Sequence, residues 1–249
     1  MSKVKFTIIT LFEDAIRPYL ESSMMWKAKE KGILAVDFVN LRDFGLGPHK
    51  SVDDTPYGGG DGMVLRPEPI YAAVESVMEK AKSAGEPTPK VILPTADGML
   101  WTEELARQFA GIPRSEYTVD SLEKSITKES EPSTHTGSSQ HYLIICPHYE
   151  GYDARILPLV DYKICLGPYI LTGGELPALI IIDSIVRLLP GVLGGETSAS
   201  MESFSDGNNI EHPQYTKPAV FRDLKVPEVL LSGDHRKVAE WRKANSKNQ

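Results

Sequence analysis

The chain contains the stretch YKICLGPYILTGGELPALIIIDSIVRLL at residues 162–189, in which an apolar run, a glycine-rich loop and a long apolar segment follow one another. Tyr162–Leu166 is short and apolar, which is typical of a buried strand. Glu175–Leu189 has Pro177 in its first turn and Gly191 just beyond its end, which predicts a helix. Because a strand followed by a helix is half of a βαβ unit, this stretch favours an α/β fold with a mostly parallel sheet.

The same alternation of strands and helices is predicted along most of the chain, from the spacing of its apolar residues. The predicted strands are Val4–Phe12, Ile33–Asn40, Val91–Leu93, Tyr142–Cys146 and Tyr162–Leu166, and the predicted helices are Pro18–Gly32, Ile70 to Gly85, Thr102–Ala110, Glu175–Leu189 and about Asp234–Ala244. In parallel sheets ligands bind beyond the carboxyl ends of the strands. The loops after the strands are therefore the expected place for a site.

The composition of the 249 residues is that of an ordinary globular chain, with 41% apolar and 24% charged residues. Two cysteines, Cys146 and Cys165, exclude a disulfide framework and a four-thiolate zinc site. The first apolar run, Phe6 to Phe12, ends at Glu13 and is too short for a signal sequence or a membrane span. We therefore expect a cytosolic protein.

Charge is distributed unevenly along the chain, whose formal net charge is −7. Residues 212–249 hold eight basic and four acidic residues, a net charge of +4, which leaves −11 for residues 1–211. An acidic body with a basic end indicates a nucleic-acid or other anionic partner, although an ordinary solvated helix gives the same pattern.

Glycine-rich or aromatic segments occur at four places. Residues 56–63 (PYGGGDGM) are interpreted as a ligand-contacting loop, a flexible lid or a bare turn. Residues 147–151 (PHYEG) and 166–175 (LGPYILTGGE) follow predicted strands, and the second leads into a helix amino terminus that favours negative charge. Residues 200–242 interleave aromatic, histidine and basic side chains, as RNA-contacting surfaces do.

Several common chemistries lack their motifs in this sequence. It has no H-E-x-x-H for a zinc enzyme, no G-x-S-x-G for an α/β-hydrolase, and no P-loop or dinucleotide-binding glycine pattern. Asp183 and Arg187 lie four residues apart and form either an exposed ion pair or a pair in which Arg187 points into a site. Residues 115–139 include eleven serine or threonine residues and are expected to be a mobile surface insertion.

Together these segments resemble the bacterial tRNA (guanine-N1)-methyltransferases of the SPOUT family. The matching segments, in chain order, are Arg42–Phe44, Val52–Gly60, His148–Gly151, Tyr169, Thr172–Ala178, Asp183–Ser184, Arg187, Pro190–Gly194, Leu230–Gly233 and Trp241–Arg242. Each segment alone is weak, but this order over more than 200 residues is specific. The insertion at 115–139 lies outside the resemblance.

The resemblance implies a parallel α/β domain with a deep trefoil knot, together with a small helical C-terminal domain. It places the knotted domain at residues 1–190, an interdomain linker at 191–215 and a shortened tRNA-binding domain at 216–249. It further implies a homodimer with the active site between the subunits, and S-adenosylmethionine as methyl donor. The reaction implied is methylation of N1 of guanine at position 37 of tRNA, just 3′ of the anticodon.

The resemblance also assigns roles to individual residues. Glu202 would be the base that removes the N1 proton, and Arg187 the cation that stabilises the charge developing on O6. The methyl donor would be held by Leu93, Pro94, Thr95, Tyr149, Glu150, Gly151, Leu166, Gly167, Tyr169, Leu171, Gly173, Gly174 and Pro177. The residues assigned to tRNA are Gly59, Ser203, His212, Ser232, Trp241 and Arg242. Magnesium is a possible further cofactor, with Glu150 as its candidate ligand.

Four features depart from the family pattern. Glu202 replaces the family's aspartate, Pro168 replaces another aspartate, Thr95-Ala96 replaces Ser-Pro, and the chain ends soon after Arg242. A longer side chain places the base differently, and a misplacement of about 1 Å can cost roughly 10²-fold in rate. These departures leave two alternatives to the implied activity: a non-catalytic paralogue that binds RNA or S-adenosylmethionine, and a SPOUT enzyme for another RNA position.

Overall fold

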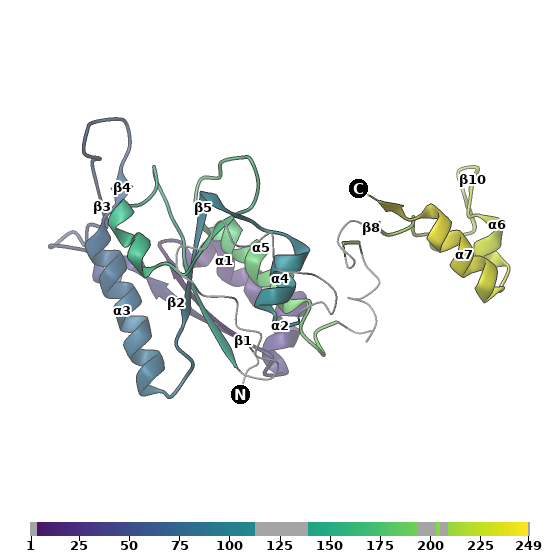
Figure 1. The fold of residues 1–249 in the computed structure, drawn as a ribbon, viewed down its shortest axis with the longest axis horizontal. Helices are drawn as coiled ribbons and strands as arrows, with labels where there is room; N and C mark the ends of the chain where they lie inside the picture. Colours follow the sequence, from purple (N-terminus) through teal and green to yellow (C-terminus); the bar gives the residue numbers. More distant parts are fainter. Residues whose placement is uncertain (1–3, 113–138, 194–202, 205–208, 249) are drawn as a thin grey trace. The chain divides into compact units, whose positions relative to one another are not determined.

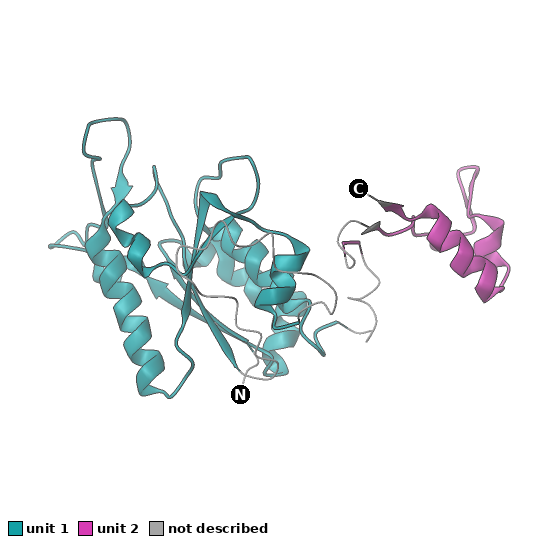
Figure 2. Cartoon of the chain, in the orientation of Figure 1, with its two compact units in different colours: residues 1–193 teal, residues 194–249 magenta. Residues whose placement is uncertain are grey.

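A computed structural model describes residues 4–112, 139–193, 203–204 and 209–248 (Figure 1). The chain divides into two compact units, Met1–Leu193 and Gly194–Gln249, shown in different colours in Figure 2. The expected domains at 1–190 and 216–249 and the linker between them remain predictions, as does the character of the insertion, which lies outside the described residues except for Ser139.

The first unit is built on a five-stranded sheet in the order β2-β1-β6-β5-β7. Every pairing in it is parallel, which confirms the α/β fold class. The strands are β1 (Val4–Thr10), β2 (Leu34–Asn40), β5 (Lys90–Leu100), β6 (Gln140–Ile145) and β7 (Tyr162–Cys165). A short antiparallel hairpin, β3 (Asp53–Asp54) with β4 (Val64–Leu65), lies outside this sheet.

Helices cover both faces of the sheet (Figure 1). One layer contains α3 (Pro67–Ser83) with the 3-10 helices η1 (Leu41–Phe44) and η3 (Ala154–Leu159), and the other contains α1 (Glu13–Leu20), α2 (Ser23–Glu30), α4 (Glu103–Phe109) and α5 (Glu175–Val186). Alternate residues of each strand supply the two faces. In β1, Ile9 packs beneath α3, whereas Thr10 reaches α5.

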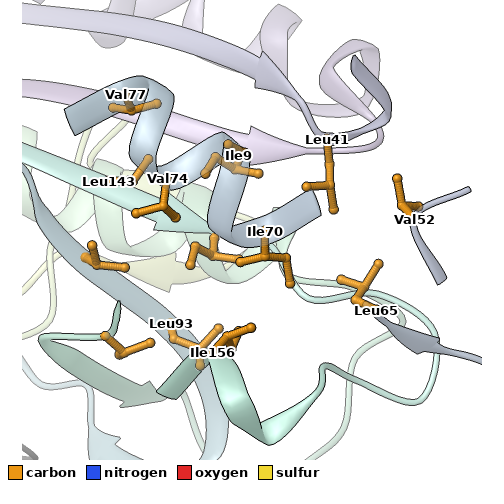
Figure 3. Packing of buried hydrophobic residues seen from close by; sticks show 14 residues of the cluster. Ile9, Leu41, Val52, Leu65, Ile70, Val74, Val77, Leu93, Leu143 and Ile156 are labelled. Carbon is orange, nitrogen blue, oxygen red and sulfur yellow. The ribbon is translucent and has the colours of Figure 1, made fainter. Parts of the chain in front are cut away.

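The core under α3 is a cluster of buried aliphatic side chains, drawn in Figure 3. Ile70, Val74 and Val77 of α3 are spaced by three or four residues and so form one face of the helix. They pack on Ile9 of β1 and Leu143 of β6. The predicted helical spacing in this segment is confirmed, and it ties α3 to the strands that carry the candidate site.

Local capping explains where two helices begin. The Thr102 hydroxyl accepts a hydrogen bond from the Leu105 N–H at 3.2 Å and so caps α4 at the first residue of the predicted helix. In the second unit, the Asp234 carboxylate accepts from the N–H groups of Arg236 and Lys237 at the start of α7 (His235–Asn245). In both cases a single side chain satisfies backbone donors that the helix leaves free.

Three predicted boundaries were wrong. The helix predicted at Pro18–Gly32 is two helices, α1 and α2, separated at Glu21–Ser22. The strand predicted at Val91–Leu93 continues through a bulge to Leu100. The helix from Glu175 ends at Val186 rather than Leu189: the N–H groups of Leu188 and Leu189 donate to carbonyls three residues back, and Pro190 has no N–H to continue the helix.

The second unit contains α6 (Glu228–Leu231), α7 and two short strand pairs whose residues were not predicted as strands. β9 (Val220–Phe221) pairs with β10 (Leu224–Lys225), and β8 (Asn209–Ile210) pairs with β11 (Lys247–Asn248); these are two antiparallel ladders within the described residues. The side chains that the structure describes in this unit are all exposed or half-buried. Across the described ranges of both units, none of the helices has the length and apolar character needed to cross a membrane.

A buried polar cluster links β1, β2 and β6 beside the end of α3. His141 lies with Nε2 2.8 Å from Thr7 Oγ1 and Nδ1 3.6 Å from a Glu86 carboxylate oxygen. Lys5 pairs with Glu86 at 2.8 Å and with Asp37 at 3.0 Å. Burial and the positive charge of Lys5 lower the pKa of His141, and the two carboxylates only partly oppose this.

We predict that His141 makes the folded state sensitive to acid. Because its folded pKa is below the ordinary value of about 6.5, the unfolded chain takes up a proton more readily as the pH falls. The stability associated with neutral His141 is therefore present above pH 6.5 and is lost as the pH falls through the folded pKa. The free energy of unfolding, measured in urea, should fall by less between pH 7.5 and pH 5.5 for His141→Gln than for the wild type.

The control is His49→Gln, since His49 is exposed and its replacement should leave the wild-type pH dependence unchanged. Equal losses of stability in the wild type and in His141→Gln would show that His141 does not carry the effect.

Candidate functional site

A cavity of about 460 Å³ lies at the carboxyl ends of three neighbouring strands, β6, β5 and β7. This is the position at which parallel sheets bind ligands. Its walls come from the loops that follow the three strands and from the first turn of α5. The lining residues are Pro94–Ala96, Pro147–Tyr152, Ile164–Gly167, Tyr169–Gly174 and Pro177.

The wall from β5 is a bulge in the strand. Pro94 and Met99 both pair with Ile164 of β7, so the four residues between them leave the ladder. A Cβ at Gly98 would lie 2.5 Å from Ile164 N, so the bulge requires glycine there. The Thr95 hydroxyl accepts a hydrogen bond from the Tyr152 hydroxyl at 3.1 Å, which joins this wall to the loop after β6.

The same bulge carries an ion pair at its tip. Asp97 contacts Lys163 of β7 at 2.5 Å and accepts a hydrogen bond from the Thr95 hydroxyl at 2.9 Å. The hydrogen bond from Lys163 lowers the pKa of Asp97. The positive charge of Lys163 is therefore already neutralised beside the cavity.

The loops after β6 and β7 join through their backbones. His148 and Gly173 form an antiparallel bridge, and the Gly174 N–H donates to the Pro147 carbonyl at 2.7 Å. A Cβ at Gly174 would lie 2.6 Å from Cys146 Cα and 2.7 Å from Pro147 N. Glycine is therefore required because backbone, rather than a movable side chain, occupies that space.

The hairpin of β3 and β4 attaches to the same loop. The Glu150 N–H donates to the Met63 carbonyl and the Leu65 N–H donates to the Gly151 carbonyl, both at 3.0 Å. The tip of the hairpin is open, since Tyr57 is fully exposed and a Cβ at Gly59 would meet nothing within 4 Å. The glycine-rich segment is thus a hairpin loop joined to the cavity wall, and its role as a lid stays untested.

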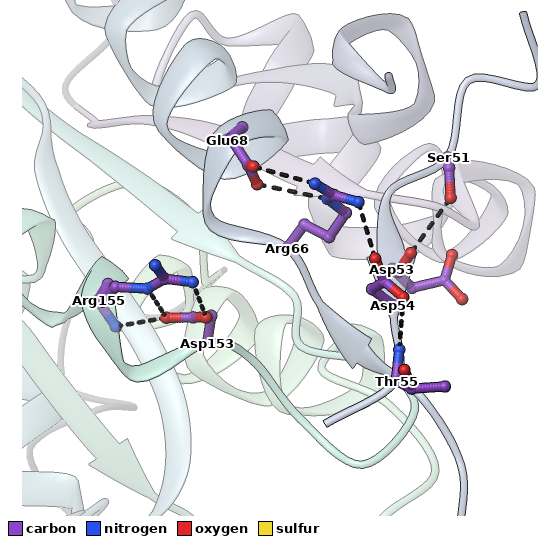
Figure 4. Close-up of polar contacts among 8 residues, drawn as sticks. All are labelled: Ser51, Asp53, Asp54, Thr55, Arg66, Glu68, Asp153 and Arg155. Atoms are coloured by element: carbon purple, nitrogen blue, oxygen red, sulfur yellow. Dashed lines mark hydrogen bonds and ion pairs between the residues drawn. The ribbon is translucent and has the colours of Figure 1, made fainter. Parts of the chain in front are cut away.

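Arginine–carboxylate pairs fix the base of this hairpin (Figure 4). Arg66 binds Asp54 at 2.9 Å and Glu68 at 3.0 Å. Arg155 binds Asp153 at 2.7 Å, and this hydrogen bond holds the pKa of Asp153 at about 2. Asp153 is therefore ionised at neutral pH, and both arginines have partners within the protein.

The structure brings together twelve of the thirteen residues assigned to the methyl donor. The exception is Leu93, which is fully buried in the core beneath α3, directly before Pro94. Sequence reasoning missed several lining residues, among them His148, Tyr152 and Cys165. Their position next to assigned residues in the same loops is the available signal.

Arg187 lies at the carboxyl end of α5, is half-buried and is outside the lining of this cavity. One turn earlier, the Asp183 carboxylate accepts a hydrogen bond from the Tyr19 hydroxyl of α1, which raises the pKa of Tyr19 to about 12. Glu202, the predicted base, lies outside the described residues. The pairing of Glu202 with Arg187 in one site therefore stays a prediction.

The second unit has a cavity of its own, of about 500 Å³, lined by His212, Tyr215 and Arg242 among others. The ring of Trp241 lies 5.8 Å from that of His212 and 6.1 Å from that of Tyr215. Three of the residues assigned to tRNA (His212, Trp241 and Arg242) are thus gathered in one place, with a cation beside aromatic rings.

The other residues assigned to tRNA are not part of the lining of this cavity. Ser232 precedes α7 and donates to the Val229 carbonyl at 2.7 Å, and Ser203 accepts from the Glu211 N–H at 3.0 Å. Gly59 belongs to the first unit. The described residues contain no group of three or more histidine, cysteine or acidic side chains that could hold a metal ion, so Glu150 is a single candidate ligand for magnesium.

Comparison with known proteins identifies the family of this chain. Residues 4–114 and 125–249 match the family described as tRNA (Guanine-1)-methyltransferase TrmD. The tRNA (guanine-N(1)-)-methyltransferase of Bacillus subtilis is 44% identical over 244 residues, which cover 98% of this chain and 87% of that protein. The corresponding protein of Anoxybacillus flavithermus is 43% identical over 244 residues, or 98% of this chain and 86% of that protein.

Among solved structures, the tRNA (m1G37) methyltransferase from Aquifex aeolicus superposes with a TM-score of 0.70 at 34% sequence identity, covering 96% of this chain and 88% of that one. Sequence and fold thus agree over nearly the whole length, including both compact units. The chain belongs to the tRNA (guanine-1)-methyltransferase family.

Proposed function

We propose that this protein transfers a methyl group from S-adenosylmethionine to N1 of guanine 37 in tRNA. The observation that carries the proposal is the cavity at the ends of β6, β5 and β7, formed by the loops whose sequences match the family. The reaction needs a cavity for the methyl donor, a base for the N1 proton, a cation for the developing charge and a surface for RNA.

The described residues suit an adenosine-containing donor. The cavity is large enough for a small-molecule ligand, and its lining combines apolar groups with backbone at Gly167, Gly173 and Gly174. Backbone N–H and C=O groups can read the edge of an adenine and the hydroxyls of a ribose. When bound, S-adenosylmethionine supplies an electrophilic methyl group on a positively charged sulfur.

The acid–base part of the mechanism falls to Glu202 and Arg187. Guanine N1 carries a proton and is a poor nucleophile, so a carboxylate that removes this proton raises its reactivity. The electron pair left on the ring spreads to O6, where the guanidinium of Arg187 would stabilise it. Both assignments rest on the family pattern, with Glu202 one methylene longer than the family's aspartate.

The second unit is proposed to hold the RNA. Its cluster of His212, Trp241 and Arg242 offers aromatic faces for stacking on bases and a cation for phosphate. The remainder of the chain is acidic, so few cations would face the phosphates and the dependence of affinity on salt should be modest. Gly59, Ser203 and Ser232 remain proposed RNA contacts.

A homodimer is also part of the proposal, and an exposed apolar surface supports it. Leu176 and Ile180 lie one turn apart on α5, with 57% and 45% of their surfaces exposed. Tyr19 of the adjacent α1, linked to α5 through Asp183, is also largely exposed. Apolar surface of this kind marks interfaces between proteins.

Three further features of the family stay predictions. The trefoil knot is one, and the location in the cytoplasm, where tRNA is modified, is another. Magnesium is the third: the described residues do not form a metal site, so no step of the mechanism is assigned to the ion.

The direct test of the proposal is methyl transfer from labelled S-adenosylmethionine to two unmodified tRNA transcripts that differ only in guanine or adenine at position 37. We expect incorporation into the guanine transcript alone. Incorporation into neither transcript, with donor binding intact, would instead identify a non-catalytic paralogue, and equal incorporation into both would indicate another RNA position.

We predict that Glu202→Gln lowers kcat by roughly 10²–10⁴-fold, because the amide cannot accept the N1 proton. Arg187→Ala should lower kcat by roughly 10²–10³-fold through loss of charge stabilisation. Donor affinity, measured by calorimetry, should be unchanged in both variants. Glu228→Gln, which loses the same charge in α6, is the control, and full activity of Glu202→Gln would show that the base is another group.

We predict that Gly174→Ala weakens donor binding by roughly tenfold or more, since the added methyl meets the backbone of Cys146 and Pro147 and must displace the loop. Gly32→Ala is the control for backbone strain away from the cavity: Gly32 has positive φ, which alanine adopts only with strain, but a Cβ there would have nothing within 4 Å. An unchanged donor affinity in folded Gly174→Ala would contradict the proposed location of the donor.

A further inference from the structure

Glu175 is a buried acidic residue beside the proposed donor cavity, and the mechanism above gives it no role. Only 8% of the residue is exposed, although it lies in the first turn of α5. Its Oε1 accepts a hydrogen bond from the Thr10 hydroxyl at 2.7 Å. A Cβ at Gly173 would lie 2.5 Å from its Oε2, so the carboxylate contacts the backbone of a residue that lines the cavity.

The charge of Glu175 is compensated mainly by the amino terminus of α5, in whose first turn it lies. Within the described ranges, no lysine or arginine lies within ion-pair distance of it. The nearest titratable nitrogen is His148 Nδ1 at 3.9 Å from Oε2, a buried atom that makes no hydrogen bond to the described residues. Burial together with the negative charge of Glu175 raises the pKa of the nearby Cys146 thiol.

Other charges around the cavity are either paired or exposed. Lys163 is neutralised by Asp97, and Glu150 lies on the exposed side of the lining, where solvent screens its charge. Charge interactions are several times stronger in partly buried surroundings than in water. Of the carboxylates described around the cavity, Glu175 is therefore the one that acts most strongly on a charge inside it.

From this arrangement we infer that Glu175 determines the preference of the cavity for a cationic ligand over a neutral one of the same shape. The inference rests on the proposed function. The donor carries a positive charge on its sulfonium sulfur, whereas the product S-adenosylhomocysteine has a neutral thioether there. Glu175 therefore strengthens binding of the donor relative to the product, which favours exchange of product for donor after each turnover.

Glu175 acts through the electric field across Gly173 and not by touching the transferred methyl group, so it is a specificity-determining residue. A purely structural role, in which Glu175 only ties α5 to Thr10, would change the affinities for donor and product by the same factor. The ratio of the two dissociation constants separates these roles.

The test is calorimetric titration of the full chain with S-adenosylmethionine, with S-adenosylhomocysteine, and with an analogue that has an ammonium group in place of the sulfonium. Glu175→Gln keeps the size of the side chain and can still accept the hydrogen bond from Thr10. We expect its Kd for both cationic ligands to rise on the order of tenfold, and its Kd for the neutral product to change by less than about twofold.

Three further variants sharpen the comparison. Glu175→Ser is a second neutral replacement of different size, for use if the glutamine variant does not fold, and it should shift the ratio in the same direction. Glu175→Asp keeps the charge and should keep the preference for the cationic ligands. Glu75→Gln removes the same charge from an exposed position on α3 and should leave all three affinities unchanged.

The outcomes distinguish the inference from the function on which it rests. If the wild type binds neither donor nor product, both are overturned. If the wild type binds both, and neutral replacement of Glu175 raises all three dissociation constants by one factor, the inference is overturned and the proposed function stands.

Discussion

The structure depends on one close approach: the backbone of the loop after β6 lies against that of the loop after β7. The hydrogen bond from Gly174 to Pro147 and the bridge between His148 and Gly173 hold this contact. The approach requires glycine at both positions, because a Cβ at either one would lie 2.7 Å or less from neighbouring atoms. The cavity, the first turn of α5 and the hairpin anchored at Glu150 are all positioned by these two loops.

The sequence predicted the parts of the fold that local chemistry determines. Apolar spacing identified α3 and all five strands of the parallel sheet, and it also identified the segment that forms α4. The glycine-rich loops after β6 and β7 were expected at a ligand site, and there they line a cavity. The role of each residue in that cavity came from the family pattern, because spacing alone does not identify a ligand.

Features that arise from tertiary contacts could not be predicted in this way. The bulge in β5 depends on how Pro94 and Met99 meet Ile164 of a strand some 70 residues later. The burial of Glu175 depends on Thr10, 165 residues away, and no local pattern at the start of α5 indicates this contact. Leu93 was assigned to the methyl donor together with its neighbour Pro94. Successive side chains of a strand point to opposite faces of the sheet, however, and that of Leu93 lies in the core.

The central claim, that the loops after β5, β6 and β7 form the donor site, is tested most directly by amide hydrogen exchange of the full chain with and without saturating S-adenosylmethionine. The account predicts slower exchange in peptides covering residues 94–100, 147–152 and 166–177, with little change in residues 75–90. The latter line a separate groove with Pro158 and Asp161. Slower exchange in that groove, with no change in the three loops, would contradict the account.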